Sequence, residues 1–226
     1  MNKVNRLIEL LSEIQIDNLT AAYPAGLFPT QRLHRYMKYS REDSNIYYSA
    51  LIAFTLQQVQ KYLSPSQLDT VQGIINHVKE NYHLYKSTSD QWLYNFYQTN
   101  PSRHYPNGYI LSRFEHFILA DDADDTVIIT MTAEEVTTEQ IQAIRRHLTK
   151  FANLQKKTIA NTLPKYKNLP AYGVWFGSGA MPIEFEFCVM CNIMYFTFHY
   201  NCELTEHDLA TLQYIRTAIH DRDIYI

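Results

Sequence analysis

The stretch Ala120-Asp-Asp-Ala-Asp-Asp-Thr-Val-Ile-Ile-Thr130 carries four carboxylates within five residues, and an apolar run follows directly. An Asp in front of such a run is an ordinary helix N-cap, because its carboxylate accepts a hydrogen bond from an unpaired backbone N–H of the first turn. The helix dipole also favours acids there. Capping explains one or two of Asp121, Asp122, Asp124 and Asp125, whereas the others add repulsion and should raise at least one pKa. The stretch therefore predicts a functional site at the start of a buried helix.

Length and composition favour a folded helical protein. Of the 226 residues, 46% are hydrophobic and 19% are charged, which is typical of a globular domain, and we expect a single domain over residues 1–226. Only 6 Gly and 8 Pro favour long helices over a turn-rich sandwich. The net charge is −3 and no cluster of Lys and Arg stands out, so nucleic acid is not an expected partner. Three Cys without regular spacing do not indicate a set of disulfides.

The sequence also bears on location. Residues 1–14 have the apolar spacing of an amphipathic helix, and Glu9 and Glu13 interrupt any signal-peptide core. No apolar run reaches the roughly 18 residues that a membrane-spanning helix needs. We therefore expect a cytoplasmic protein without a transmembrane segment.

Hydrophobic periodicity predicts an N-terminal helix over 3–14 and three helical hairpins. In each hairpin a helix that is apolar on nearly every side, and is therefore buried, precedes an amphipathic helix that is exposed on one face. The expected pairs are 46–59 with 65–82, 123–131 with 138–151, and 187–200 with 206–219.

Two segments between these helices are less regular. Residues 15–43 contain Pro and Gly and are expected to form a long loop, in which Arg32, His34 and Arg35 are interpreted as surface charge. Residues 90–118 are rich in aromatic side chains and are expected to form two short helical pieces around a loop.

Each buried helix is preceded by acids, namely Asp43, the cluster at 121–125, and Glu184 with Glu186. If the three buried helices form an inner ring, their N-termini share one end and these acids converge there. The expected fold is thus all-α, a partial α/α toroid of about three inner/outer hairpins plus an N-terminal helix. Three hairpins make half a ring, so we expect the exposed apolar flanks to be covered in a homodimer or by a missing C-terminal half.

The motif Asp122-Ala-Asp-Asp-Thr126 resembles the Asp-x-Asp-Asp-Thr motif of class II terpenoid cyclases, in which the motif also opens an inner helix of an α/α toroid. The resemblance implies that Asp124 is the general acid, flanked by Asp122 and Asp125, and that a small apolar or isoprenoid molecule is the substrate. Protonating a carbon–carbon double bond requires a carboxyl group held protonated by its surroundings. No cofactor is required for such a reaction.

In a second register, Asp121-Asp-Ala-Asp-Asp125 fits the Asp-Asp-x-x-Asp motif of class I terpenoid synthases. This resemblance implies bound Mg²⁺, with Asp121 and Asp125 as candidate ligands, because oxygen ligands suit this ion. Thr126 and the apolar helix after it favour the first register.

Other polar and aromatic side chains near the expected helix N-termini are candidates for substrate binding. They are Asp43, Tyr47, Trp175, Glu186 and Asn192. Asn192 lies within an apolar helix and needs hydrogen-bond partners, either in a cavity or on a neighbouring helix.

Two further functions are consistent with the sequence. One is a carbohydrate-active or carbohydrate-binding toroid, with Asp124 and Glu186 as an acid/base pair and aromatic rings as sugar platforms. The other is a non-catalytic interaction module, in which the Asp cluster caps a helix or binds a cation.

Overall fold

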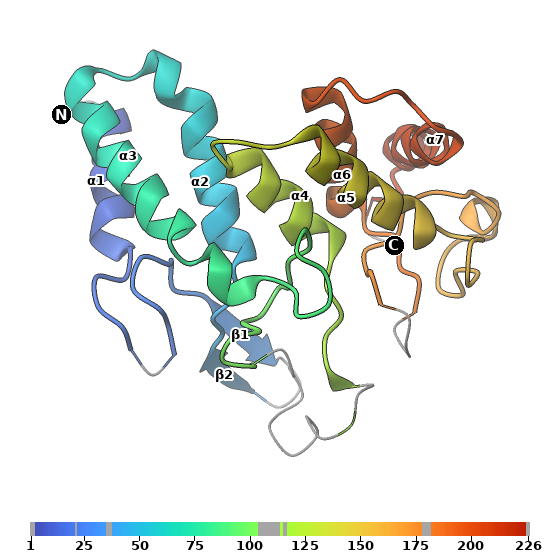
Figure 1. Ribbon diagram of the computed structural model, residues 1–226, viewed down its shortest axis with the longest axis horizontal. Coiled ribbons are helices and arrows are strands. Elements are labelled where there is room, and N and C mark those ends of the chain that lie inside the picture. The colour runs from blue at the N-terminus through green and yellow to red at the C-terminus, as the bar shows by residue number, and fades with distance from the viewer. Residues whose placement is uncertain are drawn as a thin grey trace.

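The computed structural model describes residues 3–20, 22–34, 38–103, 114, 117–177 and 182–224, without the side chains of residues 34 and 39. Within these residues the protein is mostly helical, as predicted, with one small two-stranded sheet (Figure 1). The helices are α1 (Lys3–Ile14), α2 (Tyr47–Val59), α3 (Pro65–Lys79), α4 (Ala123–Thr132), α5 (Thr138–Lys150), α6 (Phe187–His199) and α7 (Glu206–Asp221). Short 3-10 turns occupy Gln60–Tyr62, Tyr82–Tyr85 and Pro164–Tyr166.

The helices form a row of three hairpins, α2–α3, α4–α5 and α6–α7 (Figure 1). Helix α4 packs between α2 and α6, α3 lies against α2, α7 lies against α6, and α1 covers α3. Every residue of α4 is buried, which agrees with its apolar sequence. The row of hairpins is established for the described residues, whereas closure into a toroid stays a prediction.

Helices α2, α4 and α6 run in the same direction. At their C-terminal ends, the Gln57 side chain donates to the Thr132 carbonyl at 3.1 Å, and the Tyr200 hydroxyl donates to the Thr130 carbonyl at 3.3 Å. Nearer their N-terminal ends, the Asn192 amide of α6 donates to the Asp124 carboxylate of α4 at 2.7 Å. Three helix N-termini therefore face the same end of the molecule, as the sequence pattern suggested.

The structure corrects the expectation of a wholly irregular segment over residues 15–43. Strands β1 (Gln31–His34) and β2 (Tyr39–Glu42) pair in antiparallel fashion, with Gln31 opposite Glu42. Four-residue strands made largely of polar side chains lack the apolar alternation that identifies a half-buried strand. The pairing depends on the tertiary setting, where the hydrogen bond from the Asp43 N–H to the Thr30 carbonyl continues the ladder at 3.1 Å.

The segment from 90 to 103 is also corrected, because it is not helical. It forms isolated antiparallel bridges, including Tyr94 with both Lys86 and Asp122, and Asn45 with Tyr97. Residues 93, 95 and 97 are buried while 94 and 96 are only partly buried, which is the period of two expected for extended chain. The second predicted helical piece, over about 109–118, lies largely outside the described residues.

Two threonines cap the amphipathic helices that follow them. Thr137 accepts a hydrogen bond from the Gln140 N–H at the start of α5, and Thr205 forms a capping box with Asp208 at the start of α7. Asp43 is not a cap, because α2 begins after Ile46 with no capping side chain among the described residues. Glu186 precedes α6 in the N-cap position but likewise makes no capping hydrogen bond there.

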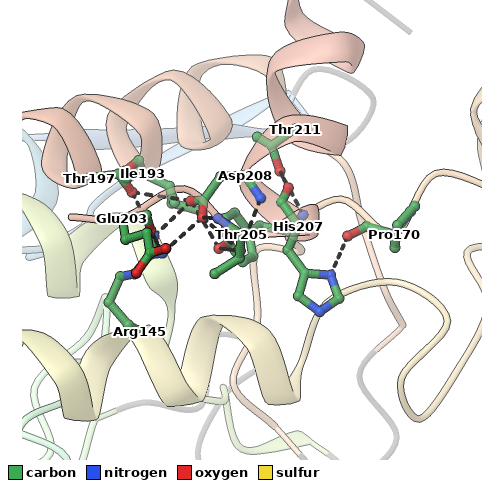
Figure 2. Close-up of polar contacts among 10 residues, drawn as sticks. Arg145, Pro170, Ile193, Thr197, Glu203, Thr205, His207, Asp208 and Thr211 are labelled. Carbon is green, nitrogen blue, oxygen red and sulfur yellow. Dashed lines mark hydrogen bonds and ion pairs between the residues drawn. The ribbon is translucent and has the colours of Figure 1, made fainter.

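An ion pair ties α5 to the third hairpin (Figure 2). Arg145 donates to both carboxylate oxygens of Asp208 at 2.7 and 2.8 Å, and also to the Thr197 hydroxyl and the Glu203 carbonyl. Asp208 is fully buried, and although burial alone would raise its pKa, hydrogen bonds from Arg145 and Thr205 hold that pKa below the usual value. This pair fixes how α7 sits on the rest of the molecule.

None of the helices in the described part of the chain is both long and apolar enough to cross a bilayer.

Candidate functional site

The N-terminus of α4 is held in place by backbone pairing on both sides. The Asp122 N–H donates to the Tyr94 carbonyl at 3.1 Å, and the Ala123 N–H donates to the Val174 carbonyl at 2.8 Å. The Thr126 hydroxyl donates to the Asp122 carbonyl at 2.7 Å and accepts from the Tyr94 N–H at 3.0 Å. The threonine of the motif therefore fixes the first turn of the helix, and the backbone around the acids is rigid.

Asp122 and Asp125 form a buried carboxyl pair. Asp122 is the N-cap of α4 and accepts from the Asp125 N–H at 2.8 Å. The Asp125 side chain is fully buried, and no donor among the described residues reaches either of its oxygens. Burial, followed by the charge of Asp122, raises the pKa of Asp125 well above its usual value. Burial also raises the pKa of Asp122, to about 7, against the lowering effect of its hydrogen bonds with Asp125.

Two carboxyl groups in contact can hydrogen-bond only if one of them carries a proton. Asp125 is the more buried member, and neither of its carboxyl oxygens has a hydrogen-bond partner among the described residues, so burial favours its protonated form. The predicted raised pKa within the cluster is therefore present, and its physical cause is burial rather than crowding alone.

Asp124 points to a different set of side chains. It is 8% exposed and accepts from the Asn192 amide at 2.7 Å. It also interacts with the Tyr47 hydroxyl, while Glu186 and Cys188 lie close enough for electrostatic coupling. Asp124 thus sits where the N-terminal parts of α2, α4 and α6 meet.

The pKa of Asp124 is raised to about 6. Burial is the main cause, the negative charge of Glu186 adds to it, and the hydrogen bonds from Asn192 and Tyr47 oppose it. At pH 7 roughly a tenth of Asp124 is then protonated, compared with about a thousandth for an ordinary Asp. An acid of this strength at neutral pH is suited to donating a proton and recovering it.

An open pocket of about 510 Å³ lies next to this end of the helices. Its lining includes Arg32, Asp43, Asn45, Tyr48, Tyr97 and Trp175. The Tyr97 hydroxyl donates to Asp43 at 3.0 Å, and Trp175 donates from its indole nitrogen to Glu184 at 2.8 Å. Tyr48 in the pocket contacts Tyr47 edge-on, with ring centroids 5.3 Å apart, and Tyr47 in turn interacts with Asp124.

The structure divides the sequence-predicted site residues into two groups. Tyr47, Asn192 and Glu186 lie around Asp124, which agrees with the expectation that the side chains near the three helix N-termini converge. Asp43 and Trp175 instead line the neighbouring pocket. Both groups lie at the same end of the molecule.

The candidate metal ligands Asp121 and Asp125 have separate partners. Asp121 accepts from the Ser87 hydroxyl at 2.5 Å and from the Asn95 amide at 3.3 Å, whereas Asp125 faces Asp122. Within the described part of the chain, no group of three or more His, Cys, Asp or Glu side chains is placed to hold a metal ion.

Sequence reasoning missed Asn45 and Tyr97, and it interpreted Arg32 only as surface charge. Tyr97 lies in the segment that was expected to be helical, and Asn45 directly precedes the first helix that was expected to be buried. The sequence Leu93-Tyr-Asn-Phe-Tyr97 has no apolar/polar alternation, and the period of two that places Tyr97 on the buried side appears only in the burial of the folded chain.

Comparisons with family models, with curated proteins and with solved structures gave no match for this chain.

Proposed function

We propose that the protein is an enzyme in which Asp124 acts as a general acid. The observation that carries this proposal is the nearly buried Asp124 carboxyl, with its raised pKa, at the meeting point of three helix N-termini. The Asn192 amide orients the carboxyl, and the Asp122–Asp125 pair fixes the helix turn from which it projects. A purely capping role needs only Asp122 and gives no reason to bury Asp124.

The resemblance of residues 122–126 to the class II terpenoid cyclase motif makes an isoprenoid alkene the first substrate class to test. In this reaction Asp124 transfers its proton to one carbon of a double bond, and the resulting cation is quenched by cyclisation and loss of a proton. Neighbouring aromatic rings such as Tyr47 would stabilise the cation through their negative faces. No cofactor is needed, and Mg²⁺ is proposed only as a counter-ion for a diphosphate on the substrate.

The test is incubation of the purified protein with squalene and, separately, with geranylgeranyl diphosphate. Asp124→Asn keeps the size of the side chain and its contact with Asn192 but cannot donate a carboxyl proton. We expect a cyclised product whose rate of formation falls at least about 100-fold in this variant. The matched control is Asp69→Asn on the exposed face of α3, which should leave the rate unchanged.

The pH dependence gives a second readout. Because the protonated form of Asp124 is the active one, the rate should rise as pH falls through about 6 and level off below it. An unchanged product yield with Asp124→Asn, or no product from either substrate, would contradict the cyclase proposal. If Asp124→Asn changes only the stability of the protein, the result would favour the non-catalytic interaction module.

Glycoside hydrolysis is a second candidate, because Glu186 is a second carboxyl coupled to Asp124 and burial raises its pKa as well. In this reaction Asp124 protonates the glycosidic oxygen and Glu186 acts as base or nucleophile. This candidate is supported if the protein releases reducing sugar from a glycan and both Asp124→Asn and Glu186→Gln abolish that release. The substrate would then be a glycan and not an isoprenoid.

We further propose that a second copy of the chain covers the exposed apolar side of the third hairpin. On α6, Tyr195 and Phe198 are 45% and 53% exposed, and on α7, Leu209 and Ile219 are 56% and 59% exposed. Exposed apolar side chains on neighbouring helices are characteristic of an interaction surface.

A further inference from the structure

The open pocket beside the acid (Arg32, Asp43, Asn45, Tyr48, Tyr97 and Trp175) has a chemistry of its own. We propose that it binds a carbohydrate, with ring hydroxyls hydrogen-bonded to Asp43 and Asn45 and a sugar face packed on Trp175. The inference concerns binding, so it does not depend on Asp124 being a catalyst.

Asn45 is the residue that first indicates a ligand. It is 3% exposed and lines the pocket. Its amide nitrogen donates toward the Thr30 hydroxyl, the Asp43 carbonyl and the Asp43 carboxylate at 3.1, 3.3 and 3.4 Å. The Asp43 carbonyl and carboxylate can only accept, so the amide nitrogen of Asn45 must face them and its Oδ1 oxygen faces the opposite side. No donor among the described residues reaches that oxygen. A buried acceptor in this state needs a hydrogen-bond donor.

The charged groups around Asp43 limit which chemical class of ligand can donate a hydrogen bond to the Asn45 oxygen. The Tyr97 hydroxyl bridges both oxygens of Asp43 at 3.0 and 3.1 Å, and Arg41 lies 3.9 Å away. Arg32 lies at the rim, with its guanidinium 3.5 Å from the Tyr97 hydroxyl. An amine or metal cation would be repelled by the two guanidinium groups, and a phosphate would face the acceptors Asp43 and Asn45.

A hydroxyl group avoids both conflicts, because its one O–H can donate to Asp43 or to Asn45 while its oxygen accepts from Arg32. An apolar isoprenoid would leave the Asn45 oxygen without a partner, at a cost of about 1–3 kcal/mol. Several hydroxyls on one small rigid ring satisfy all three groups at once, and this is the chemistry of a sugar.

The aromatic side chains supply the remaining recognition. Trp175 is partly exposed in the pocket, and its indole N–H is bonded to Glu184 at 2.8 Å, so the ring is held in one orientation. Phe96 and Tyr97 pack edge to face with centroids 4.8 Å apart, forming a second rigid wall. The volume of about 510 Å³ falls within the range of small-ligand sites.

The experiment uses the intrinsic fluorescence of Trp175, because the chain has only one other tryptophan, Trp92. In a Trp92→Phe background, the protein is titrated with cellotetraose, maltotetraose, laminaritetraose and chitotriose, and binding is checked by calorimetry. We expect saturable binding of at least one of these sugars. Asn45→Leu should weaken it at least about tenfold, because the leucine removes the acceptor while keeping the volume. Trp175→Ala, followed by calorimetry, should abolish it.

Asp69→Asn, on the exposed face of α3, is the matched control and should bind the sugar with unchanged affinity. Thermal unfolding of each variant shows whether it is folded. The inference is overturned if none of the four sugars binds at millimolar concentration. It is also overturned if a sugar binds with equal affinity to the parent and to a folded Asn45→Leu variant. Tight binding of farnesol with no binding of sugar would instead assign the pocket to an isoprenoid.

Discussion

At the scale of single residues, the buried carboxyls set the response of the protein to pH. Asp122, Asp124 and Asp125 all have raised pKa values, and burial is the first cause in each case. The folded state therefore keeps protons that the unfolded chain releases above about pH 4. The stability that this protonation contributes is fully present below the unfolded pKa. It is lost as pH rises through about 6 for Asp124 and about 7 for Asp122. For Asp124 alone the loss amounts to roughly 3 kcal/mol.

Asp125→Asn tests this assignment, because an amide resembles the protonated acid in size and carries no charge. We expect the variant to match the parent at about pH 3.5, below the unfolded pKa, and to exceed its free energy of unfolding by more than about 1 kcal/mol at pH 8. Urea denaturation at the two pH values measures the difference. Asp69→Asn makes the same chemical change at an exposed position and should give the same small effect at both. A variant less stable than the parent at pH 8 would mean that Asp125 is ionised in the fold.

Residue identities indicated some of these contacts and not others. The crowded acids required a raised pKa, and Asn192 required a partner, which proves to be Asp124. Asp43 shows where prediction from sequence fails. An Asp that caps a helix and an Asp that is hydrogen-bonded to a distant tyrosine, here Tyr97, can have the same local sequence. The hydrogen bond that distinguishes them spans more than fifty residues of chain, so no local pattern reports it.

At the scale of elements, capping and ion pairing fix how the hairpins dock. The N-caps Thr137 and Thr205 were visible in the sequence because a cap depends only on the three residues that follow it. The Arg145–Asp208 pair was not visible, because its partners lie on different hairpins. The strands β1 and β2 were missed for the same reason, since their pairing depends on surroundings and not on a strong local preference.

Arg145→Met should destabilise the protein by about 3–5 kcal/mol, because it leaves the fully buried Asp208 charge without its partner. The pKa of Asp208 is lowered in the fold, so the stability that this acid contributes is present above its unfolded pKa and lost as pH falls. The penalty of the variant should therefore shrink toward acid pH, as chemical denaturation at several pH values will show.

The matched control for this experiment is Lys79→Met. Lys79 pairs with Glu134, whose side chain is 80% exposed, so the control should cost less than about 1 kcal/mol at any pH. Equal losses in the two variants would show that the Asp208 network contributes no more than a surface pair.

At the scale of the whole molecule, the row of hairpins leaves apolar side chains of α6 and α7 exposed. If a second copy covers them, light scattering should give about twice the chain mass of 26.6 kDa. Phe198→Glu places a charge on the exposed apolar side of α6 and should shift the protein to the mass of one chain. The control is Glu9→Gln on α1, which is far from Phe198 in the sequence and should leave the mass unchanged. A mass of one chain for the parent at every concentration would exclude self-association.

The sequence by itself determined the helices, their grouping into buried and amphipathic partners, and the presence of an unusual carboxylate cluster. Each of these depends on neighbours within one or two turns, so periodicity and capping rules reach them. Only the tertiary structure decided which carboxyl keeps a proton, which faces Asn192, and which side chains form a pocket with Asn45. Burial and long-range hydrogen bonds set these properties, and both arise only when segments distant in the chain pack together.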